Sequence, residues 1–153
     1  MELEIREMWK DDLPGIIEIE DASFPRPWSC RAFLREIEEN PYALYLTGLF
    51  ADRVVGYIGG WIVIDELHIT NLAVRERFRR RGIGRKLLEE LEACSFEQGV
   101  VKATLEVRVS NIGARKLYGE AGYEEAGRRR NYYQDNGEDA VIMWKDFKKG
   151  TGD

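Results

Sequence analysis

Two glycines flanked by arginines, in the segment Arg79-Arg80-Arg81-Gly82-Ile83-Gly84, are the feature of this sequence best suited to binding an anion. A strand pattern precedes the segment and an amphipathic helical pattern follows it. Glycine removes the side chains at this point, so backbone N–H groups and the helix dipole can both face a phosphate. Short glycine loops also serve as plain connections, in which glycine only satisfies the geometry of a turn. Taken alone, the segment is consistent with either interpretation.

The charge around this loop is distributed unevenly. The chain of 153 residues has a net charge of −5, yet residues 75 to 86 hold seven cationic side chains against the single anionic Glu76. This local charge of +6 leaves −11 for the rest of the chain. Such segregation indicates one anion site on a molecule whose other surfaces attract cations. An arginine tract is also typical of nucleic-acid-binding proteins, although that function would leave the glycines unexplained.

The histidine and the two cysteines give weaker signals. His68 is the single histidine of the chain and lies in an apolar strand pattern. The sequence places no acidic or serine partner beside it, so we expect a packing or channel-lining role rather than catalysis. Cys30 and Cys94 show neither a CxxC motif nor metal-ligand spacing, so we predict neither a disulfide nor a metal site. Cys94 continues the apolar helical series of Leu87 and Leu91, which predicts a buried position.

The elements that must position these residues follow from the spacing of apolar side chains. Helical spacing predicts helices beginning near residue 12, at 29 to 40, after 84, and at 112 to 121. Runs rich in β-branched and aromatic residues predict strands near 3 to 5 and at 42 to 50, 54 to 63, 66 to 74 and 104 to 109. Two more strands are expected on either side of the turn at 134 to 137.

This order of elements predicts an α/β fold of the α+β kind, with a mixed, mostly antiparallel central sheet flanked by helices. The length suits one domain, which we expect to span residues 1–148, followed by a short flexible tail at 149–153. No apolar run approaches the length of a membrane span, and the first ten residues lack the zones of a signal peptide. We therefore expect a cytoplasmic protein with no membrane partner.

Several motifs resemble the GNAT superfamily of N-acetyltransferases, in the order of that family. The anion loop is similar to its acetyl-CoA signature Q/R-x-x-G-x-G/A, with Arg79 in the first position. Residues 71–74 resemble the strand beside the pantetheine arm, and 105–111 the next family strand. Residues 114–123 resemble the A-x-x-L-Y-x-x-x-G-F segment, with Tyr123 in place of Phe. Residues 130–133 and 138–140 resemble the RimI type, and so, more weakly, do residues 24–29.

The resemblance implies a GNAT-like sheet, acetyl-CoA as cosubstrate and no metal. It implies Glu106 as general base, directly or through water, and Tyr118 as general acid for the departing thiolate. Outside this context Glu106 would be read as a solvated strand carboxylate and Tyr118 as a packing residue. The implied cofactor-binding residues lie on the strand at 66 to 74, in the anion loop, at the start of the helix after it, and just before the helix at 112 to 121. They are Leu72, Ala73, Val74, Arg79, Arg80, Arg81, Gly82, Ile83, Gly84, Arg85 and Asn111.

The RimI resemblance also implies a substrate, the N-terminal alanine of a small-subunit ribosomal protein, presented on a basic peptide. An α-amine loses its proton far more readily than lysine, since their pKa values are about 8 and about 10.4. Trp28, Tyr132 and Tyr133 either line the amine-side groove or close the edge of the core. The alternatives are acetylation of other protein N termini, lysine side chains or small amines, and, from other classes, an acetyl-CoA sensor without catalysis or a nucleic-acid-binding module. Nucleic acid is not expected as a partner.

Overall fold

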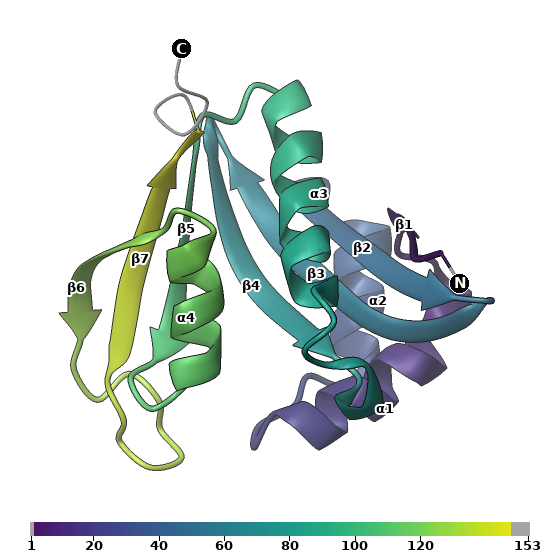
Figure 1. Ribbon diagram of the computed structural model, residues 1–153, viewed down its shortest axis with the longest axis horizontal. Helices are drawn as coiled ribbons and strands as arrows, with labels where there is room; N and C mark the ends of the chain where they lie inside the picture. Colours follow the sequence, from purple (N-terminus) through teal and green to yellow (C-terminus); the bar gives the residue numbers. More distant parts are fainter. Residues whose placement is uncertain (1, 148–153) are drawn as a thin grey trace.

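A computed structural model describes residues 2–147, which form a seven-stranded sheet with α-helices on both faces (Figure 1). The strands are β1 Glu4–Glu7, β2 Ala43–Phe50, β3 Arg53–Val63, β4 Glu66–Val74, β5 Lys102–Arg108, β6 Glu124–Arg129 and β7 Ala140–Asp146. The helices are α1 Leu13–Ser23, α2 Cys30–Glu39, α3 Ile83–Glu97 and α4 Ile112–Glu120. The tail expected at residues 149–153 lies outside the described residues.

The sheet has the strand order β1-β2-β3-β4-β5-β7-β6, and every neighbouring pair is antiparallel except β4 and β5. The parallel pairing of β4 with β5 is short and extends only from Glu66–His68 on β4 to Lys102–Thr104 on β5. Beyond this point the two strands diverge, and the sheet opens into two halves (Figure 1). The residues at the far ends of β4 and β5 therefore face a gap instead of a neighbouring strand.

A β-bulge in β4 coincides with the start of this divergence. The register between β3 and β4 shifts at Gly59 and Gly60, so Thr70 is the extra residue on β4. The Thr70 hydroxyl donates to Gly59 O at 3.2 Å and lies 3.0 Å from the hydroxyl of Tyr45. A Cβ at Gly59 would overlap the Tyr45 ring, which explains a glycine inside a strand. Because a bulge bends its strand, this one helps to turn β4 away from β5.

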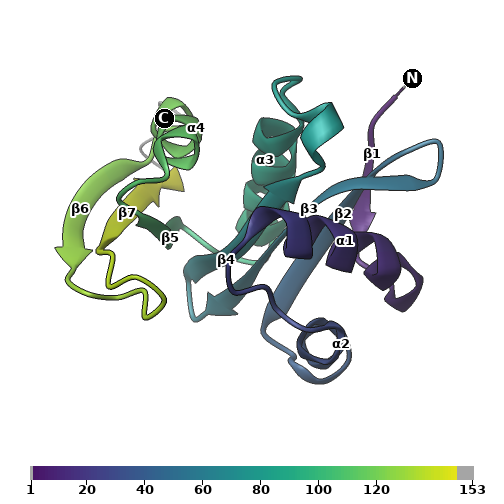
Figure 2. The same cartoon turned by 90° about the horizontal axis from the view of Figure 1, so that it is seen from below.

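The helices bury both faces of the sheet. α1 and α2 lie on one face, and α3 and α4 on the other (Figure 2). On the α3 face, Leu87, Leu88 and Leu91 are fully buried against residues of the strands. On the opposite face, Ile16 and Phe33 pack with other buried residues in a second cluster. Two apolar layers thus fix the sheet, and the gap between its halves is the opening they leave.

Most predicted elements are confirmed, including the mixed, mostly antiparallel sheet and the strand at residues 66–74. The strand expected at residues 104 to 109 begins earlier, because β5 starts at Lys102, which pairs with Glu66. The prediction that Cys94 is buried is wrong. Cys94 is half-buried, and Ser95 takes the fully buried position while its hydroxyl donates to Glu92 O at 2.9 Å.

Candidate active site

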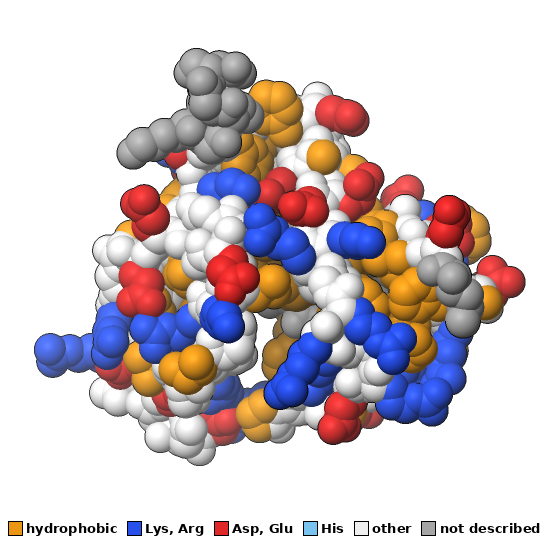
Figure 3. Space-filling view, in the orientation of Figure 1, with side chains coloured by type: hydrophobic (Ala, Val, Ile, Leu, Met, Phe, Trp, Pro, Cys, Tyr) orange, Lys and Arg blue, Asp and Glu red, His pale blue; other side chains and the backbone are white. Residues whose placement is uncertain are grey.

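Two cavities meet in the gap between β4 and β5. The first, about 650 Å³, lies against the loop before α3 and is called the loop-side cavity. The second, about 460 Å³, is called the aromatic cavity because Phe24, Trp28, Tyr118, Tyr132 and Tyr133 line it. The surface is hollowed between the two halves of the sheet, with lysine and arginine side chains on its rim (Figure 3). Tyr118 lines both cavities and lies where they join.

The start of α3 gives the loop-side cavity its backbone donors. Gly82 precedes the helix with a φ of +79°, in the left-handed region that favours glycine. The first N–H groups of a helix have no partner within it, so those of α3 are available to a ligand. A Cβ at Gly84 would meet only Leu117 Cδ2 at 3.5 Å and Val74 Cγ2 at 3.8 Å, ordinary contact distances. A glycine here keeps the space beside the helix start open.

All but one of the residues predicted to bind the cofactor line this cavity. Those that line it are Leu72, Ala73, Val74, Arg79, Arg80, Gly82, Ile83, Gly84, Arg85 and Asn111. Arg81 does not line it, since its guanidinium lies 5.3 Å from the centre of the Phe78 ring. Asn111 also caps α4, because its side chain accepts from Ala114 N at 3.1 Å.

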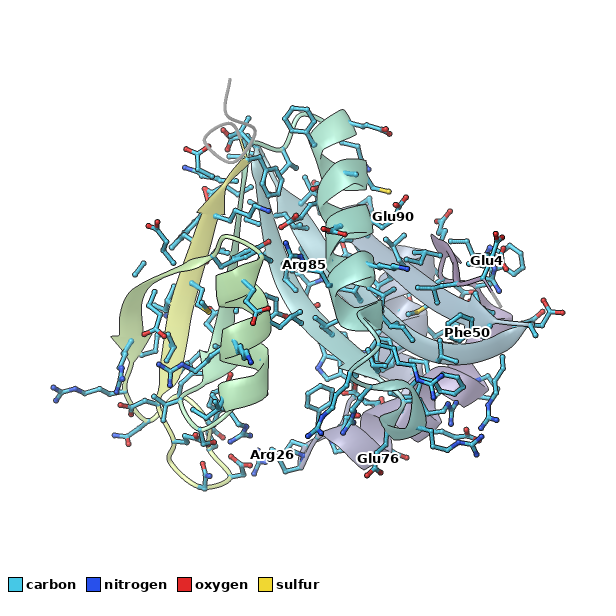
Figure 4. The ribbon with its side chains drawn as sticks, in the orientation of Figure 1. Glu4, Arg26, Phe50, Glu76, Arg85 and Glu90 are labelled. Carbon is cyan, nitrogen blue, oxygen red and sulfur yellow. The ribbon has the colours of Figure 1, made fainter. Side chains whose placement is uncertain are left out.

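Arg85 brings an unsatisfied donor to the loop-side cavity. Its side chain extends from α3 into the space between α3 and α4 (Figure 4). Its Nε is buried and has no hydrogen-bond partner among the described residues. Glu89 Oε2 lies 3.4 Å away and forms only an ion pair one helical turn along. A buried donor without an acceptor is costly, and an anionic ligand in this cavity would satisfy it.

Other arginines of the tract hold the protein together. Arg75 donates to Val54 O at 3.0 Å and to Glu18 Oε1 at 2.9 Å. Arg79 donates to Val74 O at 2.8 Å and to Ser23 Oγ at 3.3 Å. These bonds tie the loop to α1 and β3. Some arginines of the tract therefore stabilise the fold, whereas others line the loop-side cavity.

Glu106 and His68 form a close pair at the edge of the gap. Glu106 Oε2 lies 2.6 Å from His68 Nε2, and the His68 ring packs edge-on against Trp61. The Glu106 side chain is 14% exposed and lines the aromatic cavity. The hydrogen bond from His68 outweighs burial and holds the pKa of Glu106 below its ordinary value. This acidic partner was missing from the sequence-based interpretation of His68, because it depends on the register of β4 and β5.

Tyr118 is a buried residue of α4, with its ring edge-on to that of Tyr123 at 5.5 Å. Burial raises the pKa of its hydroxyl well above the ordinary value of 10, and the nearby Tyr133 adds to the effect. The phenol therefore keeps its proton at neutral pH. A tyrosine that donates its proton would be helped by a lowered pKa, but this environment raises the pKa of Tyr118.

One wall of the aromatic cavity comes from the connection between α1 and α2. Trp28 packs on Phe33 at 5.3 Å, and its backbone N–H donates to Glu20 Oε2 at 2.8 Å. Glu20 is fully buried, also accepts from the Tyr57 hydroxyl, and lines the cavity. Burial raises the pKa of Glu20 above its ordinary value. Glu20 fixes the loop that carries Trp28, a role that its place in an amphipathic helix pattern did not reveal.

The opposite wall comes from the loop between β6 and β7. Arg108 donates to Asp135 at 2.9 and 3.1 Å and pairs with Glu138 at 3.4 Å. Its guanidinium also lies 4.0 Å from the centre of the Tyr133 ring. Arg108 thus organises the loop that brings Tyr132 and Tyr133 to the cavity. Burial raises the pKa of Tyr133 to about 12.

Between residues 2 and 147, no group of three or more His, Cys, Asp or Glu side chains is placed to hold a metal ion. None of the helices described is long and apolar enough to cross a membrane.

Comparison with known proteins links this arrangement to one family. The sequence profile of the Acetyltransferase (GNAT) family matches residues 13–123. The [Ribosomal protein bS18]-alanine N-acetyltransferase of Salmonella typhimurium is 42% identical over 134 residues, which are 86% of this chain and 89% of that protein. The crystal structure of the ribosomal-protein-S18-alanine N-acetyltransferase from Escherichia coli has a TM-score of 0.86 and 34% identity, and covers 95% of this chain and 94% of that one. The PaiA N-acetyltransferase of Thermoplasma acidophilum, in complex with coenzyme A, shares the fold with a TM-score of 0.82 at 20% identity over 95% of this chain and 99% of that one.

Proposed function

The chain belongs to the acetyltransferase (GNAT) family and is an acetyltransferase, and on that premise we propose that it transfers an acetyl group from acetyl-CoA to the N-terminal alanine of ribosomal protein bS18. The single observation that carries this proposal is the junction at Tyr118, where a cavity suited to an anion meets an aromatic cavity lined by Glu106. The names of the relatives supply the alanine substrate.

The loop-side cavity fits the phosphates of acetyl-CoA. It offers the free N–H groups of the α3 start, the space beside Gly84, and the unsatisfied Nε of Arg85. Leu72, Ala73 and Val74 would bind the pantetheine arm as an added strand, because this part of β4 has no neighbour on the side of β5. Acetyl-CoA supplies the acetyl group as a thioester that an amine can attack.

The backbone N–H of Val74 is the proposed donor to the thioester carbonyl. Arg75 N–H donates to Val55 O in β3 at 2.7 Å. Successive N–H groups of a strand point to opposite sides, so that of Val74 points into the gap. A fixed donor facing the carbonyl oxygen stabilises the negative charge that develops there during attack.

Glu106 is proposed to accept the proton of the amine. Its lowered pKa keeps the carboxylate ionised at neutral pH, so it attracts the amine and can take a proton directly or through water. The imidazole of His68, 2.6 Å away, is a second group that can hold this proton. An α-amine suits this arrangement better than lysine, because less energy is needed to deprotonate it.

Tyr118 is proposed to assist the departing sulfur. For reference groups, moving a proton from tyrosine to a thiolate costs about 2 kcal/mol, and the raised pKa of buried Tyr118 increases that cost. We therefore assign its hydroxyl first as a hydrogen-bond donor to the developing thiolate. Full proton transfer follows only as the carbon–sulfur bond breaks.

The test is acetylation of a matched peptide set, read by mass spectrometry with fragmentation. The set contains the alanine-starting N-terminal peptide of bS18, the same peptide with its α-amine blocked, a lysine peptide and a small amine. We expect acetylation at the α-amine of the first peptide and none of the blocked one. Modification confined to lysine or to the small amine would favour the other GNAT activities, and no product from any acceptor would contradict the proposal.

A further inference from the structure

Both oxygens of the Glu106 carboxylate have a partner, and the two partners come from different halves of the sheet. Oε2 is contacted by His68 in β4, whereas Oε1 lies 3.6 Å from Nε of Arg129 at the end of β6. Arg129 is not part of the motifs that link the chain to its family. Its contact places a fixed positive charge at the group proposed to receive the amine.

The sheet register explains how Arg129 reaches Glu106 from an edge strand. Arg129 is paired with Ala140 of β7, and Ala140 is paired with Arg108 of β5, so these three residues form one row on one face. Glu106 lies on the same face, two residues before Arg108. Ala140 is small and buried, so it leaves space for a long side chain to cross β7.

Arg129 is held loosely. Its side chain is 58% exposed, and its guanidinium lies 6.0 Å from the centre of the Tyr132 ring. An ion pair with this much exposure is weak and is screened by salt. A protonated amine that approaches Glu106 would therefore compete with Arg129 for the same carboxylate.

We propose that Arg129 is a positioning residue that competes with the protonated acceptor amine for Glu106, so that the amine is bound preferentially in its neutral, reactive form. This inference rests on the proposed function, since it assumes an amine at Glu106. A nearby cation disfavours the charged form of an amine and so lowers its pKa. The same effect favours α-amines over lysine, whose charged form is harder to discharge.

Other charged and titratable groups around this point have fixed partners or lie further along the cavity. Arg108 is engaged by Asp135 and Glu138, and Glu20 accepts two hydrogen bonds from its own surroundings. The remaining groups that line the cavity are Arg26 of the α1–α2 connection (Figure 4), Tyr118 of α4, and Tyr132 and Tyr133 of the β6–β7 loop. Arg129 is the cation that contacts Glu106 beside His68.

The experiment compares Arg129→Gln with Arg129→Lys, using Arg128→Gln as the matched control. Arg128 is the preceding residue of the same exposed edge strand, and its side chain points to the opposite face. The measurements are kcat and KM for the alanine peptide between pH 6 and 9.5, with acetyl-CoA affinity determined separately. Because the chain contains a single histidine, the imidazole NMR signals of His68 can also be recorded at pH 7 without any substrate.

For Arg129→Gln we expect the acid limb of kcat to move to higher pH, with kcat about 2- to 5-fold lower at pH 7 and unchanged near pH 9.5. KM at pH 7 should fall, because the protonated amine then binds better without reacting. The His68 imidazole signals recorded at pH 7 should also differ from those of wild type. Arg129→Lys and Arg128→Gln should remain close to wild type, and high salt should reduce the differences.

Two outcomes would overturn the inference. One is a loss of kcat in Arg129→Gln that is equal at every pH, which would indicate a structural role. The other is a pH profile of kcat and a set of His68 imidazole signals that both match wild type. The proposed function fails in a distinguishable way, because a wild-type enzyme that acetylates no α-amine would reject that proposal even when the His68 signals of Arg129→Gln change as expected.

Discussion

The two cavities that meet at Tyr118 are built in different ways. The loop-side cavity is formed largely by one continuous stretch, from Leu72 to Arg85, in which the backbone supplies much of the chemistry. The aromatic cavity is assembled from segments far apart in the chain, including the α1–α2 connection, β5 and the β6–β7 loop. The first depends on local backbone geometry, and the second depends on side chains that tertiary packing brings together. The two should therefore respond differently to mutation.

The largest effect is expected where the cavities join. Glu106→Gln and Tyr118→Phe should each lower turnover by at least tens-fold, since general acid-base catalysis is worth about 10²- to 10⁴-fold. Acetyl-CoA affinity should change little. The measurement is steady-state turnover on one alanine peptide, with binding checked by calorimetry. Wild-type rates for both variants would show that these residues are structural.

The pH dependence separates the two residues. Loss of Glu106 should be partly rescued at high pH, where an α-amine loses its proton unaided. Loss of Tyr118 should not be rescued, because the departing thiolate still lacks its donor. Equal behaviour of the two variants from pH 6 to 9 would contradict separate proton roles.

The next largest effect should fall on the loop-side cavity alone. Gly84→Leu should weaken acetyl-CoA binding by about tenfold or more, because the new side chain would occupy space beside the helix start that the phosphates need. Gly119→Leu, on an open surface of α4, is the matched control for a leucine introduced into a helix. Thermal unfolding should show that both variants fold. Unchanged calorimetric affinity in Gly84→Leu would count against this cavity as the cofactor site.

A smaller effect should be confined to the aromatic cavity. Arg108→Gln removes the group that organises Asp135, Glu138 and Tyr133, so KM for the peptide should rise about 3- to 10-fold with little change in acetyl-CoA affinity. Arg108 lowers the pKa of Asp135, and hydrogen bonding from Ser110, with a smaller effect of Arg108, lowers that of Glu138. The contribution of these carboxylates is therefore lost only as pH falls through these lowered values. Wild-type peptide KM should therefore show no change from this source between pH 6 and 9. A weakened affinity for acetyl-CoA in Arg108→Gln would contradict the separation of the two cavities.

The smallest difference should distinguish two arginines that the sequence treats alike. Arg85→Gln should weaken acetyl-CoA binding by several-fold, because the Arg85 side chain lines the loop-side cavity and its Nε has no hydrogen-bond acceptor among the described residues. Arg81→Gln should have a smaller effect, since Arg81 lies over Phe78 outside that cavity. Calorimetry at two salt concentrations would measure both. Equal losses would indicate that the tract acts as diffuse charge.

The same contrast explains which features of the two cavities could be predicted from the sequence alone. The loop at residues 79–84 and the strand before it were predictable, because their chemistry depends on neighbouring residues. The pairing of His68 with Glu106 was not, since it requires the short parallel register of β4 with β5. The apolar pattern also misled at Cys94, because Ser95 satisfies its hydroxyl within its own helix and can be buried. The local backbone geometry can be predicted from the sequence, whereas contacts between side chains on different strands can be identified only from the structure.

The most direct test of the account is the affinity of a conjugate in which coenzyme A is joined through an acetyl link to the α-amine of an alanine-starting peptide. If the two cavities are continuous at Tyr118, this conjugate should bind at least about 100-fold more tightly than coenzyme A in calorimetry. Gly84→Leu and Arg108→Gln should each weaken its binding, one from each side. A conjugate that binds no more tightly than coenzyme A would contradict the claim that the acetyl group and the amine meet at this junction.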